Sequence, residues 1–494
     1  MPKIESSYRA VTLVLAALAA AAFAYPLWRI GAGFEIDYNE GWNAFLQSIA
    51  ARGESPYTTP GPLFFNNYPP LSFYLVGVLG SLLGDPLLVG RALSALAVAT
   101  ISLSCGVVTR AGGGDRTDAV FAAATCLGLF CAFATDYVGV NDPQLLAQGL
   151  LCLGFAIYVG GPATPARLVL VAVLFALGLL TKHNVLALPL VVTIHALWQS
   201  PPKARLAFLG ATLALMALAL AVILAAFGTD FFHRLLASRI YDPTRGFLLS
   251  MEMLGHLQIP LAASLLFMVL VPRQSAAKSM VGAYLALGLL IGFGFASGAG
   301  VDINIYFDTL IGSAMGCGLL LAWIRRQTAL PRQSALAAAL LVNFGVLLIA
   351  PQTFGRIVVD ALGDYSERER LFAEDVAYLS GLPGPAICES MLLCLKAGKG
   401  VWIDPYNLLQ ASLTGRLPAD QLVGMLRRHE VAVLQMISQR EHPLHEAPGQ
   451  QVIPPRFVNF GDDVHDELDL SYRVARVGLT GRFYLPKASP PPVP

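Results

Sequence analysis

The sequence predicts an all-α polytopic membrane protein with about eleven transmembrane helices and additional outer interfacial helices, followed by a small C-terminal α/β domain outside the membrane. Of the 494 residues, 55% are hydrophobic and only 13% are charged, with a mean hydropathy of +0.61. A soluble protein of this length would carry about 25% charged residues. Long apolar stretches fill residues 1–353, whereas residues 354–494 are polar and hold 17 of the 32 Asp and Glu residues.

Eleven apolar stretches meet or approach the length of about 17–25 residues that a membrane-spanning helix needs. They lie near residues 8–30, 87–110, 117–135, 144–160, 166–181, 184–198, 206–228, 256–272, 278–298, 304–324 and 334–353. The two stretches that meet around residue 181 are short. The first stretch is long and lacks a small-residue cleavage site, so we interpret it as a retained span rather than a signal peptide.

The distribution of Lys and Arg predicts the orientation. Every second loop is basic, and these loops contain Lys3, Arg9, Arg110, Arg116, Arg167, Lys203, Arg205, Arg273, Lys278, Arg325, Arg326 and Arg332. The alternate loops hold fewer basic residues. We therefore expect a cytoplasmic N-terminus and an extracytoplasmic location for residues 354–494. Residues 70–84 are apolar but short, and counting them as a span would invert every later loop, so we expect a helix in the outer interface there.

The acidic residues of the membrane part collect between the apolar stretches. They include Asp37, Glu40, Asp136, Asp142, Asp302 and Asp308, and in the topology above these six all face the outer side. A charge at the bilayer centre costs about 2.5–3.5 kcal/mol on insertion scales, so carboxylates stay at the rim unless they act inside the membrane. A one-sided rim of carboxylates indicates chemistry at the membrane surface rather than ion conduction.

Residues 354–494 form a segment long enough for an independent core. The segments VWID (401–404) and VAVLQMI (431–437) predict buried strands, residues 419–430 predict a helix, and KASPPPVP (487–494) predicts a disordered tail. Cys388 and Cys394 form either a disulfide in an oxidising compartment or two core thiols. No Cys/His spacing predicts a zinc site, and a net charge of +1 gives no reason to expect a nucleic-acid partner.

The first outer loop, residues 31–69, carries the best chemical signal. Residues 39–52 fit an amphipathic helix at the membrane surface, with Glu40 on its polar face. Asp37 and Glu40 resemble a capping box, in which both side chains only satisfy backbone donors. The alternative is that one of them is a general base at a water-accessible rim.

Further candidate substrate-binding residues lie in the same loop and the other outer segments. They are Asn67 and Tyr68 before a Pro-Pro corner, Arg91 at an outer helix end, Asp142, Lys182, His183, Arg239, Asn304 and Tyr306. A structural alternative exists for several of them. Asp142 precedes a helix and has the character of an N-cap, and the Lys182–His183 pair fits side chains that extend to lipid headgroups.

Several segments, taken in order, resemble the GT-C superfamily of membrane glycosyltransferases, and specifically bacterial members similar to protein O-mannosyltransferases and lipid A aminoarabinose transferases. The matching segments are DYNEGW (37–42), RGESPY (52–57), NYPPLSFY (67–74), GRALSAL (90–96), NDPQLLA (141–147), LTKHNVLALPL (180–190) and DPYNLLQASLTGRL (404–417). Two positions depart from the family pattern. Asn39 precedes Glu40 where an Asp-Glu pair is common, and Tyr68 stands where some relatives have Lys.

The resemblance implies a GT-C-like fold and an inverting transfer of a sugar from a polyprenyl-phosphate donor to a glycan, lipid or protein acceptor. It also implies a location in the bacterial inner membrane. Glu40 or Asp37 would take the proton from the acceptor hydroxyl, while Lys182, Arg91 or Arg239 would bind the phosphate. The resemblance implies no cofactor and no metal, although a divalent cation at Asp142 stays an open alternative.

Two other functions remain as alternatives. A flippase or transporter of lipid-linked sugars would use the same lipid, although ion coupling would favour charged groups inside the spans. A polysaccharide polymerase or ligase would need a diphosphate-linked donor. A purely structural role would leave the acidic first loop unexplained.

Overall fold

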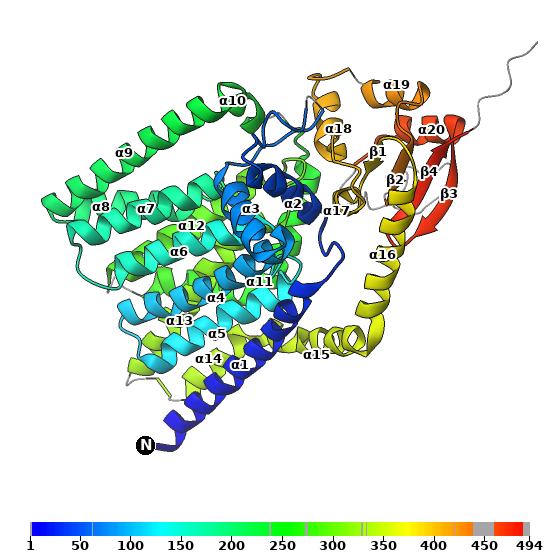
Figure 1. The fold of residues 1–494 in the computed structure, drawn as a ribbon. Helices are drawn as coiled ribbons and strands as arrows, with labels where there is room; N and C mark the ends of the chain where they lie inside the picture. The colour runs from blue at the N-terminus through cyan, green and yellow to red at the C-terminus, as the bar shows by residue number, and fades with distance from the viewer. Residues whose placement is uncertain are drawn as a thin grey trace, which may run out of the picture.

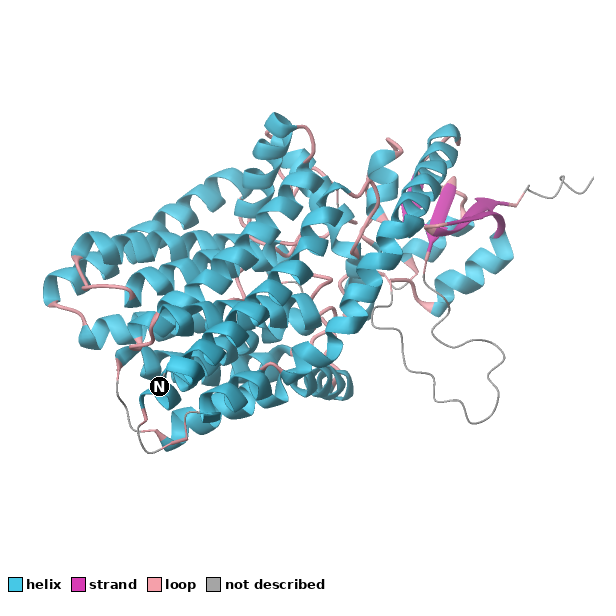
Figure 2. Cartoon of the chain, turned by 90° about the horizontal axis from the view of Figure 1, so that it is seen from below, coloured by secondary structure: helices cyan, strands magenta, loops and turns pink. Residues whose placement is uncertain are grey.

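The computed structural model describes residues 2–61, 63–236, 239–271, 275–327, 330–331, 333–418, 420–437 and 459–487, and the statements below refer to these residues. A bundle of helices forms the N-terminal part, and a sheet with its own helices lies at one end of this bundle (Figure 1). A perpendicular view shows the strands gathered at that end (Figure 2). The predicted C-terminal tail lies outside the described residues, apart from Lys487.

The N-terminal part is almost entirely helical. Its helices are α1 (Pro2–Trp28), η1 (Arg29–Gly31), α2 (Tyr38–Ala51), α3 (Leu71–Leu83), α4 (Pro86–Ala111), α5 (Arg116–Phe133), α6 (Pro143–Val159), α7 (Pro165–Thr181), α8 (Ala187–Gln199), α9 (Pro202–Phe227), α10 (Asp230–Leu235), α11 (Pro243–Leu270), α12 (Ala276–Phe295), η2 (Ile303–Tyr306), α13 (Phe307–Arg326), α14 (Gln333–Val342) and α15 (Phe344–Val359).

Every predicted span contains a helix. Within the described ranges, eight helical segments are long and apolar enough to cross a membrane. The helices α6, α7 and α8 are shorter, with 17, 17 and 13 residues. The predicted interfacial segment at 70–84 is the 13-residue helix α3. The chain is therefore a multi-pass helical membrane protein, whereas the number of crossings stays a prediction.

Two predicted boundaries differ from the structure. The outer segment 229–255 is largely helical, because α11 begins at Pro243, where Asp242 caps the backbone N–H of Thr244 at 2.9 Å. The last predicted span, 334–353, is interrupted at Asn343 between α14 and α15. The Asn343 side chain donates to the carbonyl of Ala339 at 3.1 Å, which competes with the helical backbone bond.

The basic and the acidic loops lie at opposite ends of the bundle. The N-terminus and the connections that follow α4, α6 and α8 lie at the end far from the sheet, whereas α2 and α10 lie near it (Figure 1). This arrangement agrees with the alternation of Lys and Arg between loops. The cytoplasmic location of the basic end stays a prediction from that alternation.

The predicted domain boundary at residue 353 falls inside α15, which continues to Val359. A π-helical turn η3 (Asp360–Asp364) then turns the chain into α16 (Tyr365–Gly381), which runs up to the sheet (Figure 1). The remaining elements are β1 (Ala386–Cys388), α17 (Met391–Lys396), α18 (Pro405–Leu413), α19 (Gln421–Arg427), β2 (Val433–Met436), α20 (Asp462–Ser471), β3 (Tyr472–Gly478) and β4 (Gly481–Pro486).

The sheet has the strand order β1-β2-β4-β3, in which β1 and β2 are parallel and the other neighbours are antiparallel. The predicted strand at 431–437 is β2, and the predicted helix at 419–430 is α19. The predicted strand at 401–404 is wrong. Val401 and Ile403 are buried, but Trp402 reaches β1 through its indole N–H, 2.9 Å from the carbonyl of Ala386, without a backbone ladder.

Cys388 and Cys394 form a disulfide with a Cα–Cα distance of 5.8 Å. The bond links the end of β1 to α17, and α17 packs on α2. The contact is close at Gly41, where a Cβ atom would lie only 2.2 Å from the backbone nitrogen of Leu392. The disulfide alternative for the two cysteines therefore holds, and the C-terminal part rests directly on the first loop.

Candidate active site

Asp37 is the N-cap of α2. Its Oδ1 accepts the backbone N–H of Asn39 at 2.9 Å, and its backbone is extended, as an N-cap requires. Within the described ranges, Oδ1 is the only oxygen of this carboxylate that accepts a hydrogen bond. One oxygen thus positions the side chain, and the other remains available to a ligand.

Glu40, one turn further along α2, is paired with Arg91 of α4. The Arg91 Nη2 lies 2.6 Å from Glu40 Oε2 and its Nε lies 2.7 Å from Oε1, and neither side chain is exposed. The backbone N–H groups of Ile36 and Asn141 also donate to this carboxylate, at 2.8 and 3.0 Å. Both Glu40 oxygens therefore accept two hydrogen bonds each.

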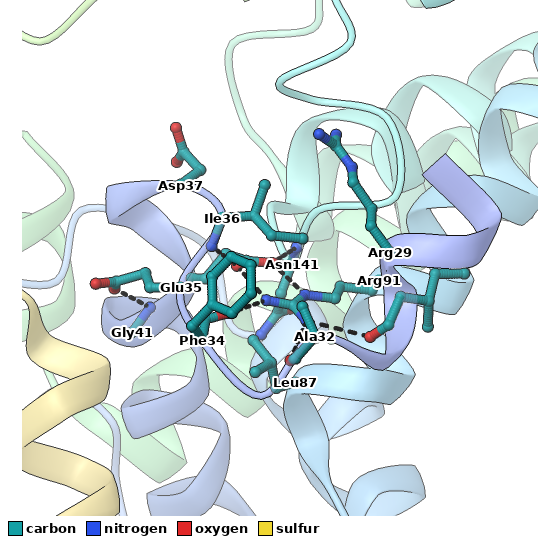
Figure 3. Close-up of polar contacts among 12 residues, drawn as sticks. Arg29, Ala32, Phe34, Glu35, Ile36, Asp37, Gly41, Leu87, Arg91 and Asn141 are labelled. Carbon is teal, nitrogen blue, oxygen red and sulfur yellow. Dashed lines mark hydrogen bonds and ion pairs between the residues drawn. The ribbon is translucent and has the colours of Figure 1, made fainter. Parts of the chain in front are cut away.

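Arg91 donates its remaining N–H groups to the chain between η1 and α2. The carbonyls of Ile30, Ala32 and Phe34 accept them at 3.1, 2.7 and 2.8 Å (Figure 3). The guanidinium thus satisfies all of its donors inside the protein. Arg91 and Glu40 hold the first loop in shape, and neither has a group left for substrate.

A polar cavity of about 90 Å³ lies where the first loop meets the other outer loops and the C-terminal part. Its lining consists mainly of carboxylates, amides and aromatic side chains: Asp37, Tyr38, Asn39, Trp42, Asn67, Tyr68, Tyr137, Arg239, Gly300, Asp302, Asn304, Asp404, Tyr406, Asn407 and Asn459. Neutral amides and aromatic rings that surround a few carboxylates are suited to a polar, hydroxyl-rich ligand.

Asp37 is a cavity carboxyl whose ionisation is strongly shifted by its surroundings. Burial raises the pKa of this carboxyl to about 7, although the Asn39 N–H works in the opposite direction. The negative charges of Asp142, Glu40 and Asp302 raise it further. A pKa near 7 suits a general base, because the group is ionised at neutral pH and still binds a proton.

Behind the cavity wall, Lys182 lies against Tyr68. Its Nζ is 3.2 Å from the Tyr68 hydroxyl, 4.4 Å from the centre of that ring and 3.6 Å from Asp142 Oδ1. Asp142 also caps α6, because Oδ1 accepts the N–H of Gln144 at 2.7 Å. Lys182 is buried and does not line the cavity, whereas Tyr68, which it contacts, does.

Among the described residues that line this cavity, Arg239 is the only basic one. Its Nη1 donates to the carbonyl of Ala299 at 2.9 Å, so the guanidinium has other N–H groups for a ligand. Asn67 and Asn304 also line the cavity. Tyr306 does not, because it is buried with its hydroxyl 2.6 Å from Ser250, and His183 lies exposed outside the lining.

The C-terminal part supplies residues that sequence reasoning did not select. Asp404 caps α18, and its Oδ2 accepts the indole N–H of Trp42 at 2.9 Å. Burial raises the pKa of Asp404 to about 6, against the effect of its hydrogen bonds from Asn407 and Trp42. Tyr406 belongs to the same DPYN segment, which the resemblance had marked as a motif without giving it a role.

Among the described residues, no group of three or more His, Cys, Asp or Glu side chains is placed to hold a metal ion. This observation does not test divalent-cation binding at Asp142, because a bound substrate also contributes oxygen atoms that coordinate a cation. The nearest cation to Asp142 in the structure is the Lys182 ammonium.

Comparison with known proteins gives matches at the level of structure. Neither a protein-family model nor a curated protein sequence matches the chain. ArnT from Cupriavidus metallidurans, in a crystal structure bound to undecaprenyl phosphate, matches 95% of this chain and 97% of its own length, with a TM-score of 0.56 and 16% identity. The oligosaccharyltransferase AglB from Archaeoglobus fulgidus, solved with an inhibitory peptide and a dolichol-phosphate, matches 87% of this chain and 69% of its own, with a TM-score of 0.53 and 12% identity.

The arabinofuranosyltransferase AftD from Mycobacteria matches 96% of this chain over 41% of its own length, with a TM-score of 0.50 and 16% identity. At these identities the likeness establishes the fold, and function must be argued from the site. The chain therefore has the GT-C fold shared by these membrane glycosyltransferases, as the sequence motifs led us to expect.

Proposed function

We propose that this chain is a membrane glycosyltransferase that moves a sugar from a polyprenyl-phosphate donor to an acceptor hydroxyl at the extracytoplasmic face, with inversion at the anomeric carbon. The observation that carries the proposal is the position of Asp37. Its carboxylate lines a polar cavity at the outer ends of the helices, with one oxygen held by the Asn39 N–H.

In this reaction Asp37 is the general base. Its carboxylate takes the proton from the acceptor hydroxyl as that oxygen attacks the anomeric carbon of the donor sugar. The bond between the anomeric carbon and the phosphate oxygen breaks, and the lipid phosphate leaves with the bonding electrons. Attack and departure occur on opposite faces of the sugar, so the configuration inverts.

Between the two carboxylates that the sequence left open, the contacts favour Asp37 over Glu40. The Glu40 oxygens accept from Arg91, Ile36 and Asn141, and this side chain is not part of the cavity lining. A carboxylate in a bidentate pair with a buried Arg would lose that pair on protonation. Glu40 therefore has a structural role in this proposal.

The donor phosphate requires positive charge, and in this proposal Arg239 and Lys182 supply it from different positions. Arg239 lines the cavity directly, and Lys182 supports the Tyr68 hydroxyl from behind. Elsewhere, removal of one group that stabilises developing negative charge costs about 2.7–4 kcal/mol in the transition state. The lipid phosphates bound in the ArnT and AglB structures support a donor of this class.

The lipid tail of such a donor stays in the membrane, which explains a cavity at the outer rim of the bundle. The acceptor, a glycan, lipid or protein, reaches the cavity from outside. We place the chain in a bacterial inner membrane, with the basic loops in the cytoplasm and the C-terminal part outside. The donor carries its own leaving group, so the proposal includes no cofactor.

The test is sugar transfer by purified protein supplied with labelled undecaprenyl-phosphate sugars and envelope membranes as the acceptor source. We expect Asp37→Asn to lower the rate at least a hundredfold, as expected for loss of a general base, with unchanged thermal stability. Asp136→Asn is the matched control, because Asp136 lies exposed in the second outer loop and outside the cavity lining. Full activity of Asp37→Asn would overturn the assignment of the base.

A second outcome concerns the class of protein. If wild type releases no polyprenyl phosphate from any monophosphate donor, a flippase or a diphosphate-donor enzyme is favoured.

A further inference from the structure

Asn459, in the C-terminal part, lines the cavity together with residues of the membrane-helix loops. It is 7% exposed, and it directly precedes Phe460, which anchors it in the core of the C-terminal part. Its Nδ2 donates to Glu389 Oε1 at 2.6 Å, whereas its Oδ1 is buried without a hydrogen-bond partner in the described part of the chain.

The orientation of this amide follows from its partner. The other Glu389 oxygen, Oε2, accepts the backbone N–H of Ile437, so the carboxylate is held in place as an acceptor on both oxygens. A flipped Asn459 would direct its carbonyl oxygen at a carboxylate oxygen, where neither atom has a proton to share. Glu389 therefore directs the Asn459 carbonyl oxygen away from itself.

A buried acceptor without a donor is unfavourable, and a ligand that donates a hydrogen bond there is favoured accordingly. A phosphate oxygen is itself an acceptor and does not satisfy Oδ1. A sugar hydroxyl donates and does satisfy it. Asp404, the carboxylate that the C-terminal part contributes to the described lining, already accepts from Trp42 and Asn407.

We propose that Asn459, oriented by Glu389, accepts a hydrogen bond from a hydroxyl group of a sugar bound in the cavity. The C-terminal part then recognises the sugar rather than the lipid phosphate. This inference rests on the proposed function. The sugar belongs either to the donor or to the acceptor, and Glu389 is a positioning residue that acts only through Asn459.

The experiment compares the binding of two probes in detergent: undecaprenyl phosphate alone, and undecaprenyl phosphate that carries a neutral hexose. We expect Asn459→Ala to weaken binding of the glycosylated lipid about tenfold and to leave binding of the bare lipid unchanged. If instead both lipids bind as in wild type but transfer needs about tenfold more acceptor membrane, the recognised hydroxyl belongs to the acceptor. Unchanged binding and unchanged transfer kinetics would overturn the proposal.

Glu389→Gln tests the orientation, because a glutamine either donates to or accepts from the Asn459 amide and no longer enforces one orientation. We expect a smaller loss in the same parameter, and no further loss when Glu389→Gln is added to Asn459→Ala. Additive losses would show that Glu389 acts independently. Glu467→Gln is the matched control, since Glu467 is buried in the same part of the chain, pairs with Arg427 at 3.0 Å and lies outside the cavity lining.

The two proposals fail in different ways. If wild type neither prefers the glycosylated lipid nor transfers its sugar, the proposed function fails. If wild type prefers the glycosylated lipid and transfers its sugar, and Asn459→Ala binds and transfers equally well, only the proposed role of Asn459 is wrong. Thermal stability of each variant, measured without ligand, separates a change in recognition from a change in folding.

Discussion

Trp42 of the first loop donates its indole N–H to Asp404 of the C-terminal part, across 2.9 Å and 362 positions of sequence. The indole ring is buried between the rings of Phe64, Tyr68 and Phe73. Both ends of this bond line the cavity. The bond thus joins the two walls of the proposed active site.

Trp42→Phe keeps an aromatic ring in place and removes this donor, together with part of the buried indole volume. Asp404 is almost fully buried, and loss of one of its hydrogen bonds costs about 1–3 kcal/mol. We expect a lower midpoint of thermal unfolding and a roughly tenfold lower rate of sugar transfer. Trp198→Phe serves as the control, because Trp198 lies 78% exposed on α8. Equal behaviour of the two variants would show that the bond contributes nothing.

Gly41→Ala tests whether close packing of α2 on α17 shapes the cavity. The added Cβ atom would lie 2.2 Å from the Leu392 nitrogen and 2.5 Å from Glu35 Oε1, so α17 must move. We expect the transfer rate to fall at least tenfold while the helix content measured by circular dichroism stays constant. Gly31→Ala is the control in the same loop, since nothing lies within 4 Å of its added atom. Normal transfer by Gly41→Ala would mean that the C-terminal part adjusts without effect on the site.

Arg91→Leu is expected to destabilise the protein rather than to act on chemistry alone. It leaves Glu40 buried without its ion-pair partner, a change that typically costs about 3–5 kcal/mol. The measurement is the thermal unfolding midpoint in detergent. Arg52→Gln breaks an exposed pair with Glu54 and should leave the midpoint unchanged. An Arg91→Leu protein that is stable but has lost phosphate affinity would return Arg91 to the list of phosphate-binding candidates.

The pH dependence of the transfer rate should follow the ionisation of the Asp37 carboxyl. A general base must be ionised, so kcat/KM rises with pH and levels off above the pKa of about 7, with a tenfold loss for each unit below it. With the ordinary Asp value of 3.8, the profile would be flat through this range. Asp302→Asn removes a neighbouring negative charge and should shift the inflection to lower pH. An inflection that does not move would assign the titration to another group.

The local chemistry of the sequence was sufficient to predict most of the helices and to identify the acidic first loop as a candidate site. Apolar length predicted the positions of α4 and α5 within two residues, because desolvation of a helix depends on its own composition. The break between α14 and α15 at Asn343 was not predicted. A single Asn inside an apolar run does not by itself indicate a helix break, and its contact with another helix, a hydrogen bond to Thr125 at 3.1 Å, is visible only in the fold.

The sequence by itself determined the class of protein, the approximate position of most apolar helices and the choice of Asp37 and Glu40 as candidate carboxylates in the first loop. Only the tertiary structure decided that Asp37 lines the cavity while Glu40, three residues on, is paired with Arg91. It also brought Asp404 and Asn459 to the same cavity. The physical reason is that hydrophobic patterning is local, whereas the role of a carboxylate depends on which distant donor and which cavity the folded chain places beside it.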